Sequence, residues 1–152
     1  MNHARRSVLK TTGVFGVLFA AGILTSKQLW AAADNRATFD AKTLTDAIKS
    51  IGGTAVDSND ISINAPDIAE NGAVVPITVS STLANVQEIY ILVEKNPFPL
   101  AASFILADGT EPSVQTRIKM GQSSNVVAVV KADGKFYTAS KETKVTLGGC
   151  GG

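Results

Sequence analysis

The chain has 152 residues, of which 14 are basic and 13 acidic, giving a formal net charge of +1. It contains a single histidine, a single tryptophan and a single cysteine. One cysteine cannot close an internal disulfide or hold an iron–sulfur cluster, so both are excluded within one chain.

Residues 1–33 have the features of an export signal. A basic start with Arg5 and Arg6 precedes a mildly apolar run over residues 13–24, and small residues suited to cleavage follow, ending at Ala33. The apolar run is shorter than the roughly 18 residues that a spanning helix needs. We therefore expect a signal that is cleaved. The alternative is an uncleaved segment that anchors the protein in the membrane.

The paired arginines indicate the route of export. They stand in "RRSVLK", which resembles the twin-arginine signal, although Val8 occupies a position where that pattern often has Phe. We expect export to the bacterial periplasm by the twin-arginine route, with the mature protein beginning near Asp34.

The mature part differs in composition from the whole chain. Residues 1–33 hold four basic residues and no acidic ones, leaving 10 basic against 13 acidic residues, and they also hold His3 and Trp30. A weakly acidic domain does not suit a nucleic-acid surface, which needs clustered Lys and Arg. Without histidine there is no Ser-His-Asp or Cys-His pair to activate a nucleophile, and no imidazole to bind a metal.

Residues 34–147 are expected to form one domain that opens with a helix. In "FDAKTLTDAIKSIGG", Asp40 is the predicted N-cap, Gly52 is the predicted stop, and an apolar stripe lies between them. The stripe consists of Leu44, Ala47, Ile48 and Ile51.

After the helix, short apolar runs separated by turn signals predict seven or eight strands in an immunoglobulin-like β-sandwich. The predicted strands cover residues 61–65, 74–80, 86–94, 101–107, 114–120, 125–131, 135–139 and 144–147. Asp133-Gly134 is a strong hairpin signal between two of them. In "VQTRIKM", alternation predicts that Val114, Thr116, Ile118 and Met120 face one way while Gln115, Arg117 and Lys119 face the other, so that this strand has one solvated face.

Two strands are apolar on both faces, namely "IYILV" at residues 89–93 and "VVAVV" at residues 126–130. A sandwich sheet normally buries only its inner face. Either the N-terminal helix or a long loop covers the second face, or a partner protein docks there. The sequence leaves these alternatives open.

The single cysteine, Cys150, lies in "GGCGG" at the end of the chain. It is flanked by four glycines: Gly148, Gly149, Gly151 and Gly152. Glycine offers no side chain to pack and loses much backbone freedom on ordering, so residues 148–152 are expected to form a mobile arm. The step from Leu147 to Cys150 reaches roughly 10 Å when extended.

The thiol has no histidine to activate it. Lys141 and Lys144 are near in sequence and would favour the thiolate if they approached the sulfur. We interpret Cys150 as a covalent attachment point whose chemistry is supplied by other proteins.

The chain resembles the SoxY family, the sulfur-carrier subunit of the periplasmic thiosulfate-oxidising system. The likeness is carried by "IAENGAVVPITV" at residues 68–79 and "RIKMGQSSNVVAVVKADGKFYTASKETKVTLGGCGG" at residues 117–152. The position of "GGCGG" at the extreme C-terminus, together with the export signal, makes the resemblance specific.

The resemblance implies a non-catalytic carrier without cofactor or metal, in which Cys150 is the carrier cysteine. Thiosulfate would be attached as a cysteine S-thiosulfonate by a haem protein of the system. A hydrolase and a dehydrogenase would then act on the bound sulfur. It also implies a heterodimer with a small β-rich SoxZ subunit, and neither nucleic-acid binding nor stable membrane insertion.

The sequence is also compatible with other classes of function. The chain could be an exported structural or binding protein whose free cysteine forms an intermolecular disulfide, although a disulfide does not require four flanking glycines. Ubiquitin-like sulfur carriers also end in Gly-Gly and bear sulfur as a C-terminal thiocarboxylate, but they act in the cytosol.

Overall fold

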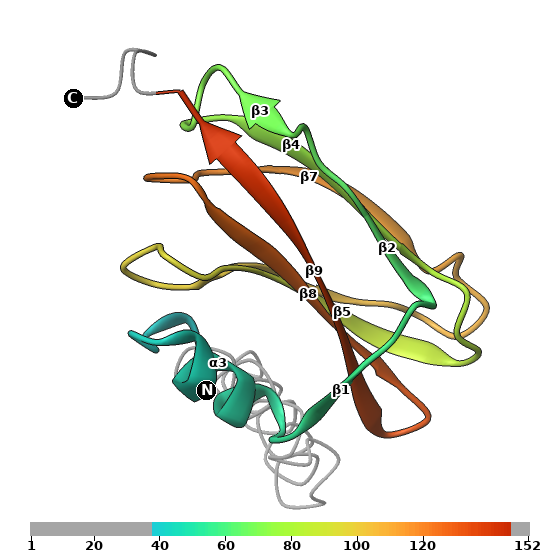
Figure 1. Ribbon diagram of the computed structural model, residues 1–152. Helices are drawn as coiled ribbons and strands as arrows, with labels where there is room; N and C mark the ends of the chain where they lie inside the picture. The colour runs from blue at the N-terminus through green and yellow to red at the C-terminus, as the bar shows by residue number, and fades with distance from the viewer. Residues whose placement is uncertain (1–37, 147–152) are drawn as a thin grey trace, which may run out of the picture. The chain divides into compact units, whose positions relative to one another are not determined.

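A computed structural model describes residues 38–146 of the chain (Figure 1). Its helix, α3, spans Leu44–Ile51. The N-cap is Thr43, whose side chain accepts a hydrogen bond from the Asp46 N–H at 3.1 Å, so the expected cap at Asp40 was wrong. Asp46 also accepts a hydrogen bond from the Thr43 hydroxyl, and a carboxylate in the first turn complements the helix dipole. Gly52 ends the helix as predicted.

The described residues contain nine strands in two sheets, where the sequence predicted seven or eight strands. Their bounds are β1 Ala55–Asp57, β2 Ile61–Asn64, β3 Ile68–Ala69, β4 Val75–Ser81, β5 Val86–Val93, β6 Leu100–Ile105, β7 Ser113–Ile118, β8 Ser124–Ala132 and β9 Lys135–Val145. The short strands β1 and β3 were not expected. The predicted strand at 135–139 and the first two residues of the one predicted at 144–147 belong to one continuous strand, β9, and residue 147 lies outside the described residues.

Strand β9 connects the parts of the larger sheet. That sheet has the order β1-β9-β8-β5-β6, and β3 also pairs with β9. The smaller sheet has the order β2-β4-β7. Strands β8 and β9 form the predicted hairpin, in which Asp133 and Gly134 have φ of 49° and 72°, the left-handed conformation that a two-residue turn of this kind needs.

The main core lies between the two sheets. Strand β4 alternates strictly, burying Val75, Ile77 and Val79, and these residues pack with Ile91 of β5 and Ala128 of β8 from the other sheet. The predicted inward face of β7 and the residues after it is confirmed. Val114, Ile118 and Met120 are buried and Thr116 is half-buried, while Gln115, Arg117 and Lys119 are exposed.

Helix α3 covers the outer face of β5 and β8. Ala47 of the helix is fully buried in a second apolar cluster with Tyr90, Leu92, Val127 and Val129. The rest of the predicted apolar stripe, Leu44, Ile48 and Ile51, packs against the same cluster. The doubly apolar strands are therefore explained by a helix of the same domain, and a docking partner is not needed to cover them.

Candidate functional site

The predicted site residues lie outside the described part of the chain. Cys150 and its flanking glycines Gly148, Gly149, Gly151 and Gly152 follow the last described residue, Thr146. The structure instead describes the end of β9, which precedes these residues in the chain. We call Val145 and Thr146 the arm base.

Backbone pairing holds the arm base on one side through β3. Ile68 and Ala69 pair in parallel with Lys144 and Val145. The Lys144 N–H donates to the Asp67 carbonyl at 2.9 Å, and the Thr146 N–H donates to the Ala69 carbonyl at 3.1 Å. Backbone hydrogen bonds therefore hold the end of β9 and the next residue, Thr146, which is the last described residue.

Side chains add further hydrogen bonds at the arm base. The Thr146 hydroxyl lies 3.4 Å from the Ala69 carbonyl oxygen and 3.2 Å from the Glu70 carbonyl oxygen, so its one proton is shared between them. On the other side, the Ser123 hydroxyl accepts from the Val145 N–H at 2.9 Å and lies 3.4 Å from the Val145 carbonyl oxygen. Each residue of the arm base therefore has a side-chain hydrogen bond as well as its ladder contact.

The turn that carries Ser123 is itself braced by the loop after β5. The Asn96 amide donates to the Lys119 carbonyl at 2.8 Å and accepts from the Gly121 N–H at 3.1 Å. The Gln122 amide donates to the Lys95 carbonyl at 3.3 Å. These contacts join two loops that are far apart in sequence and keep Ser123 in position.

Gly72 permits close packing beneath the arm base. A Cβ on Gly72 would lie 2.5 Å from the Met120 carbonyl oxygen and 2.8 Å from Val145 Cγ1, closer than real Cβ contacts. The Met120 N–H donates to the Gly72 carbonyl at 2.7 Å. Only glycine lets this loop approach the backbone so closely.

One buried hydroxyl near the arm base lacks a partner. Thr143 is fully buried, and its Oγ1 has no hydrogen-bond partner among the described residues. An unsatisfied buried hydroxyl costs about 1–3 kcal/mol.

The two lysines that lie near Cys150 in sequence differ in their contacts. Lys141 Nζ lies 3.1 Å from Asp67 Oδ1 and donates to the Ala65 carbonyl at 2.7 Å, so its charge is engaged within the folded domain. Lys144 is exposed on β9 beside Ile68. Lys144 is therefore the one of the two that is not tied to an acidic residue in the described structure.

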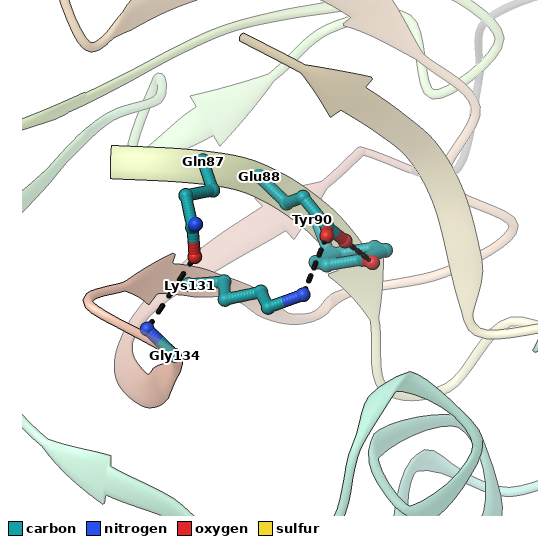
Figure 2. Close-up of polar contacts among 5 residues, drawn as sticks. All are labelled: Gln87, Glu88, Tyr90, Lys131 and Gly134. Atoms are coloured by element: carbon teal, nitrogen blue, oxygen red, sulfur yellow. Dashed lines mark hydrogen bonds and ion pairs between the residues drawn. The ribbon is translucent and has the colours of Figure 1, made fainter. Parts of the chain in front are cut away.

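A cluster of polar side chains, Glu88, Tyr90 and Lys131, joins β5 to β8 on the face that α3 covers (Figure 2). Lys131 Nζ lies 2.7 Å from one carboxylate oxygen of Glu88, and the Tyr90 hydroxyl donates to the other. Partial burial raises the pKa of the Glu88 carboxyl, but the hydrogen bonds from Lys131 and Tyr90 and the charge of Lys131 together lower it below its usual value. Burial and the Glu88 carboxylate raise the pKa of Tyr90 above its usual range.

The hydrogen-bonding groups of this cluster bind one another. Glu88 has both oxygens engaged, and Gln87 beside it accepts from the Gly134 N–H at 3.4 Å in the β8–β9 turn (Figure 2). These contacts link β5 to β8, and the Glu88 carboxylate, with both oxygens engaged, is not available to transfer a proton. We assign it to stability.

Within residues 38–146, no group of three or more His, Cys, Asp or Glu side chains is placed to hold a metal ion. In the same part of the chain, no helix has the length and apolar character required to cross a membrane.

Sequence reasoning missed the residues that hold the arm base. Ser123, Asn96, Gly72 and Thr146 carry no local motif, and each acts on a segment between 22 and 77 residues away. The only hint in the sequence was the Asn71-Gly72 pair, which marks a turn but not the close approach to Met120.

The model of the family described as "Sulfur oxidation protein SoxY" matches residues 48–150. A solved structure of the sulfur carrier protein SoxY from Chlorobium limicola f thiosulfatophilum is 41% identical, covers 69% of this chain and 97% of that chain, and has a TM-score of 0.62.

Two other solved chains are less similar. One, from a structure on T cell specificity and activation by the bacterial superantigen toxic shock syndrome toxin-1, is 16% identical over 57% of this chain and 98% of that chain, with a TM-score of 0.40. An engineered protein is 14% identical over 57% of this chain and 20% of that chain, also with a TM-score of 0.40. No curated protein matches the chain. The family match and the SoxY structure together establish that the chain belongs to the SoxY family, the sulfur carriers of thiosulfate oxidation.

Proposed function

We propose that this SoxY-family chain carries thiosulfate-derived sulfur as a covalent adduct of Cys150 while partner enzymes act on it. The observation that carries the proposal is the family match, which extends through residue 150 and so includes the cysteine. The structure supports it by placing a hydrogen-bonded arm base four residues before that cysteine.

The adduct forms by oxidation. The Cys150 sulfur and the outer sulfur of thiosulfate become bonded to one another as a cysteine S-thiosulfonate, one proton leaves the thiol, and two electrons pass to a haem partner. Hydrolysis then breaks the bond between the two thiosulfate sulfurs: water supplies the oxygen of the released sulfate, and Cys150 keeps a persulfide. The outer sulfur of the persulfide then loses six electrons to the dehydrogenase partner and gains three oxygens from water, and a second hydrolysis releases it as sulfate and regenerates the thiol. Every step needs a catalyst from another chain.

The arm of residues 148–152 suits this role. Glycine on both sides of Cys150 keeps the arm narrow, so that it can enter a confined active site that bulkier residues would block. Ordering a glycine segment costs conformational entropy at each visit, which favours brief contacts with several enzymes over tight binding to one.

We also propose that residues 1–33 are a cleaved twin-arginine signal and that the mature chain works in the periplasm. The support is the pair Arg5 and Arg6, the short apolar run and the small residues ending at Ala33. Cleavage removes Trp30, so the exported protein lacks tryptophan.

For the partner, we propose a heterodimer with a SoxZ-like subunit, supported by membership of the SoxY family. The haem, hydrolase and dehydrogenase components of the system would dock transiently. We further infer that the sandwich, residues 34–147, is of immunoglobulin-like type. The support is that three strands, β2, β4 and β7, face the four consecutive strands β9, β8, β5 and β6 in the other sheet.

The test is reconstitution with the purified partner components and thiosulfate. The Cys150→Ser variant should support no sulfate release while the wild-type chain does. Equal activity of the two would show that another group carries the sulfur, and the proposal would fail.

A further inference from the structure

The turn between β3 and β4 contains the dipeptide Asn71-Gly72, and Asn-Gly occurs nowhere else in the sequence. The side-chain amide carbon of an asparagine can be attacked by the backbone nitrogen of the next residue, and glycine has no Cβ to hinder that attack. Asn71 is exposed to water. This pair is therefore the position in the chain at which deamidation is chemically easiest.

Deamidation of this pair takes two steps and needs neither an oxidant nor a reductant. The Gly72 nitrogen gives up its proton and bonds to Asn71 Cγ, the bond from Cγ to Nδ2 breaks, and ammonia leaves with that proton. The product is a five-membered succinimide. Water then opens the ring at one of its two carbonyls. One opening gives aspartate, and the other gives isoaspartate, in which the backbone runs through the former side chain and is one carbon longer.

Three hydrogen bonds oppose ring closure. The Asn71 side-chain oxygen accepts from the Ala73 N–H at 2.9 Å, the Asn71 carbonyl accepts from the Val74 N–H at 3.3 Å, and the Gly72 carbonyl accepts from the Met120 N–H at 2.7 Å. Ring closure requires Asn71 Cγ and the Gly72 nitrogen to eclipse one another about the Cα–C bond, a backbone conformation outside the main allowed regions. The turn must therefore open before the reaction can take place.

Packing of Gly72 adds a second restraint. A Cβ there would lie 2.5 Å from the Met120 carbonyl oxygen and 2.8 Å from Val145 Cγ1, so the Gly72 backbone has no room to move toward either residue. Rotation of the peptide between Asn71 and Gly72 thus requires the turn to separate from the loop that carries Met120 and from the end of β9.

The arm base holds the turn against that separation. The Thr146 N–H donates to the Ala69 carbonyl at 3.1 Å, and the Thr146 hydroxyl lies 3.4 Å from the same oxygen and 3.2 Å from the Glu70 carbonyl oxygen. Ala69 and Glu70 directly precede Asn71. These contacts must break, or at least lengthen, when the turn opens, so the hydrogen bonds of Thr146 control access to the reactive conformation.

We propose that Asn71-Gly72 is a deamidation site that the folded chain holds closed, and that separation of residues 69–74 from the arm base opens it. The change is self-sustaining. Isoaspartate lengthens the backbone by one carbon where Gly72 already abuts the Met120 carbonyl, and the new carboxylate lies beside the charge of Glu70 in sequence. A modified turn therefore does not close again in its original form, and the arm base loses part of its support.

The first measurement compares the folded full chain with the same chain in urea, at one pH and one temperature. Trypsin releases residues 50–95 as one peptide, and fragment mass spectra show where an amide has become a carboxyl group. Deamidation at Asn71 should be at least about tenfold slower in the folded chain, because only the opened fraction reacts. In urea, Asn59 and Asn64 should react after Asn71, since residues with a Cβ follow them.

A matched pair of variants separates local opening from global unfolding. Thr146→Val removes the hydroxyl that lies against two carbonyl oxygens, and it should speed deamidation of the folded chain by about fivefold, as expected for the loss of one hydrogen bond. Ile48→Ala weakens the packing of α3 and leaves the turn unaltered. Its deamidation rate should stay within about twofold of wild type. Asn71→Ser removes the amide but keeps an oxygen that can accept from the Ala73 N–H, so it supplies an unmodified reference.

Hydrogen exchange at the Thr146 amide measures the consequence. In wild type incubated until Asn71 is modified, this amide should exchange at least about tenfold faster than before, while Asn71→Ser incubated for the same time should not change. Equal deamidation rates in the folded chain and in urea would overturn the proposal. So would an unchanged rate in Thr146→Val, an equal acceleration in Ile48→Ala, or unaltered Thr146 exchange in the modified chain.

Discussion

The Ser123 hydroxyl accepts a hydrogen bond from the Val145 N–H at 2.9 Å and lies 3.4 Å from the Val145 carbonyl oxygen. One side chain thereby engages both backbone groups of the residue that precedes the end of the described chain. The hydroxyl takes the place that a neighbouring strand would have in the ladder. This contact holds the end of β9, which leads to the residues of the proposed arm.

Ser123→Ala is expected to loosen the arm base. The variant loses both contacts to Val145, which should lower the free energy of unfolding by about 1 kcal/mol and speed hydrogen exchange of the Val145 amide. Ser113→Ala, at an exposed serine on β7, is the control and should change neither quantity. Unaltered exchange at Val145 in Ser123→Ala would mean that the serine does not hold the strand end.

Gly72→Ala is expected to be destabilising because its new Cβ would overlap the Met120 carbonyl oxygen. Relief requires the backbone of two loops to move apart, and overpacking of this kind costs about 1–3 kcal/mol. Gly121→Ala is the matched control, since a Cβ there has Asn96 Oδ1 at 3.8 Å as its nearest neighbour. Urea denaturation of both variants measures the difference. Equal midpoints would contradict the close packing beneath the arm base.

Thr143→Val is expected to preserve or increase stability. The substitution keeps the shape of a fully buried side chain and removes a hydroxyl that has no partner within the described structure. Relief of that desolvation cost should raise the free energy of unfolding by up to about 1 kcal/mol. Thr143→Ser keeps the hydroxyl, removes a methyl group and should be less stable than wild type. A clear loss of stability in Thr143→Val would show that the hydroxyl is satisfied after all.

The free energy of unfolding should fall at low pH because Glu88 becomes protonated. Its pKa is lower in the folded chain than in the unfolded chain, so the unfolded chain takes up the proton first as the pH falls. The stabilising contribution is present above the unfolded pKa of about 4.3 and is lost as the pH falls through the lower folded pKa. Glu88→Gln should therefore be about 1 kcal/mol less stable than wild type at pH 7.

The difference between wild type and Glu88→Gln should close as the pH falls from 5 toward 3. Thermal unfolding over that range measures it. A constant difference at every pH would show that Glu88 contributes through packing and not through its charge.

Most of the strands could be predicted because they are apolar runs bounded by turn signals. Alternation along β7 and the Asp133-Gly134 turn are local signals, and both were realised as predicted. The apolar stripe of α3 was also correct, but the helix begins at Leu44 because Thr43 is its N-cap and accepts a hydrogen bond from the Asp46 N–H. Asp40 precedes the helix and does not cap it.

The base of the proposed arm could not be predicted, because its contacts are made by residues distant in sequence. Strand β3 has two residues and pairs with β9 about 76 residues later, and no local pattern marks so short a strand. Joining residues 135–145 into one strand depends on β8, which pairs with β9 from Ser124 to Ala132. The tail sequence pointed to Cys150, and tertiary structure showed how the end of β9, which precedes it in the chain, is held.

Cys150→Ser is expected to leave stability unchanged. A thiol that is presented to partner enzymes makes no contribution to the core, so thermal unfolding of the variant should match wild type while sulfur carriage is lost. Destabilisation by more than about 1 kcal/mol would indicate a packed thiol and would contradict presentation on an arm.

The most direct measurement of the central claim is the mass of the C-terminal tryptic peptide, residues 145–152, from protein isolated during thiosulfate turnover. We predict sulfur-containing additions on Cys150 that disappear on reduction and are absent from the Cys150→Ser chain. An unmodified peptide in an actively turning-over system, or a mass gain located on Gly152 instead, would contradict covalent carriage by the cysteine.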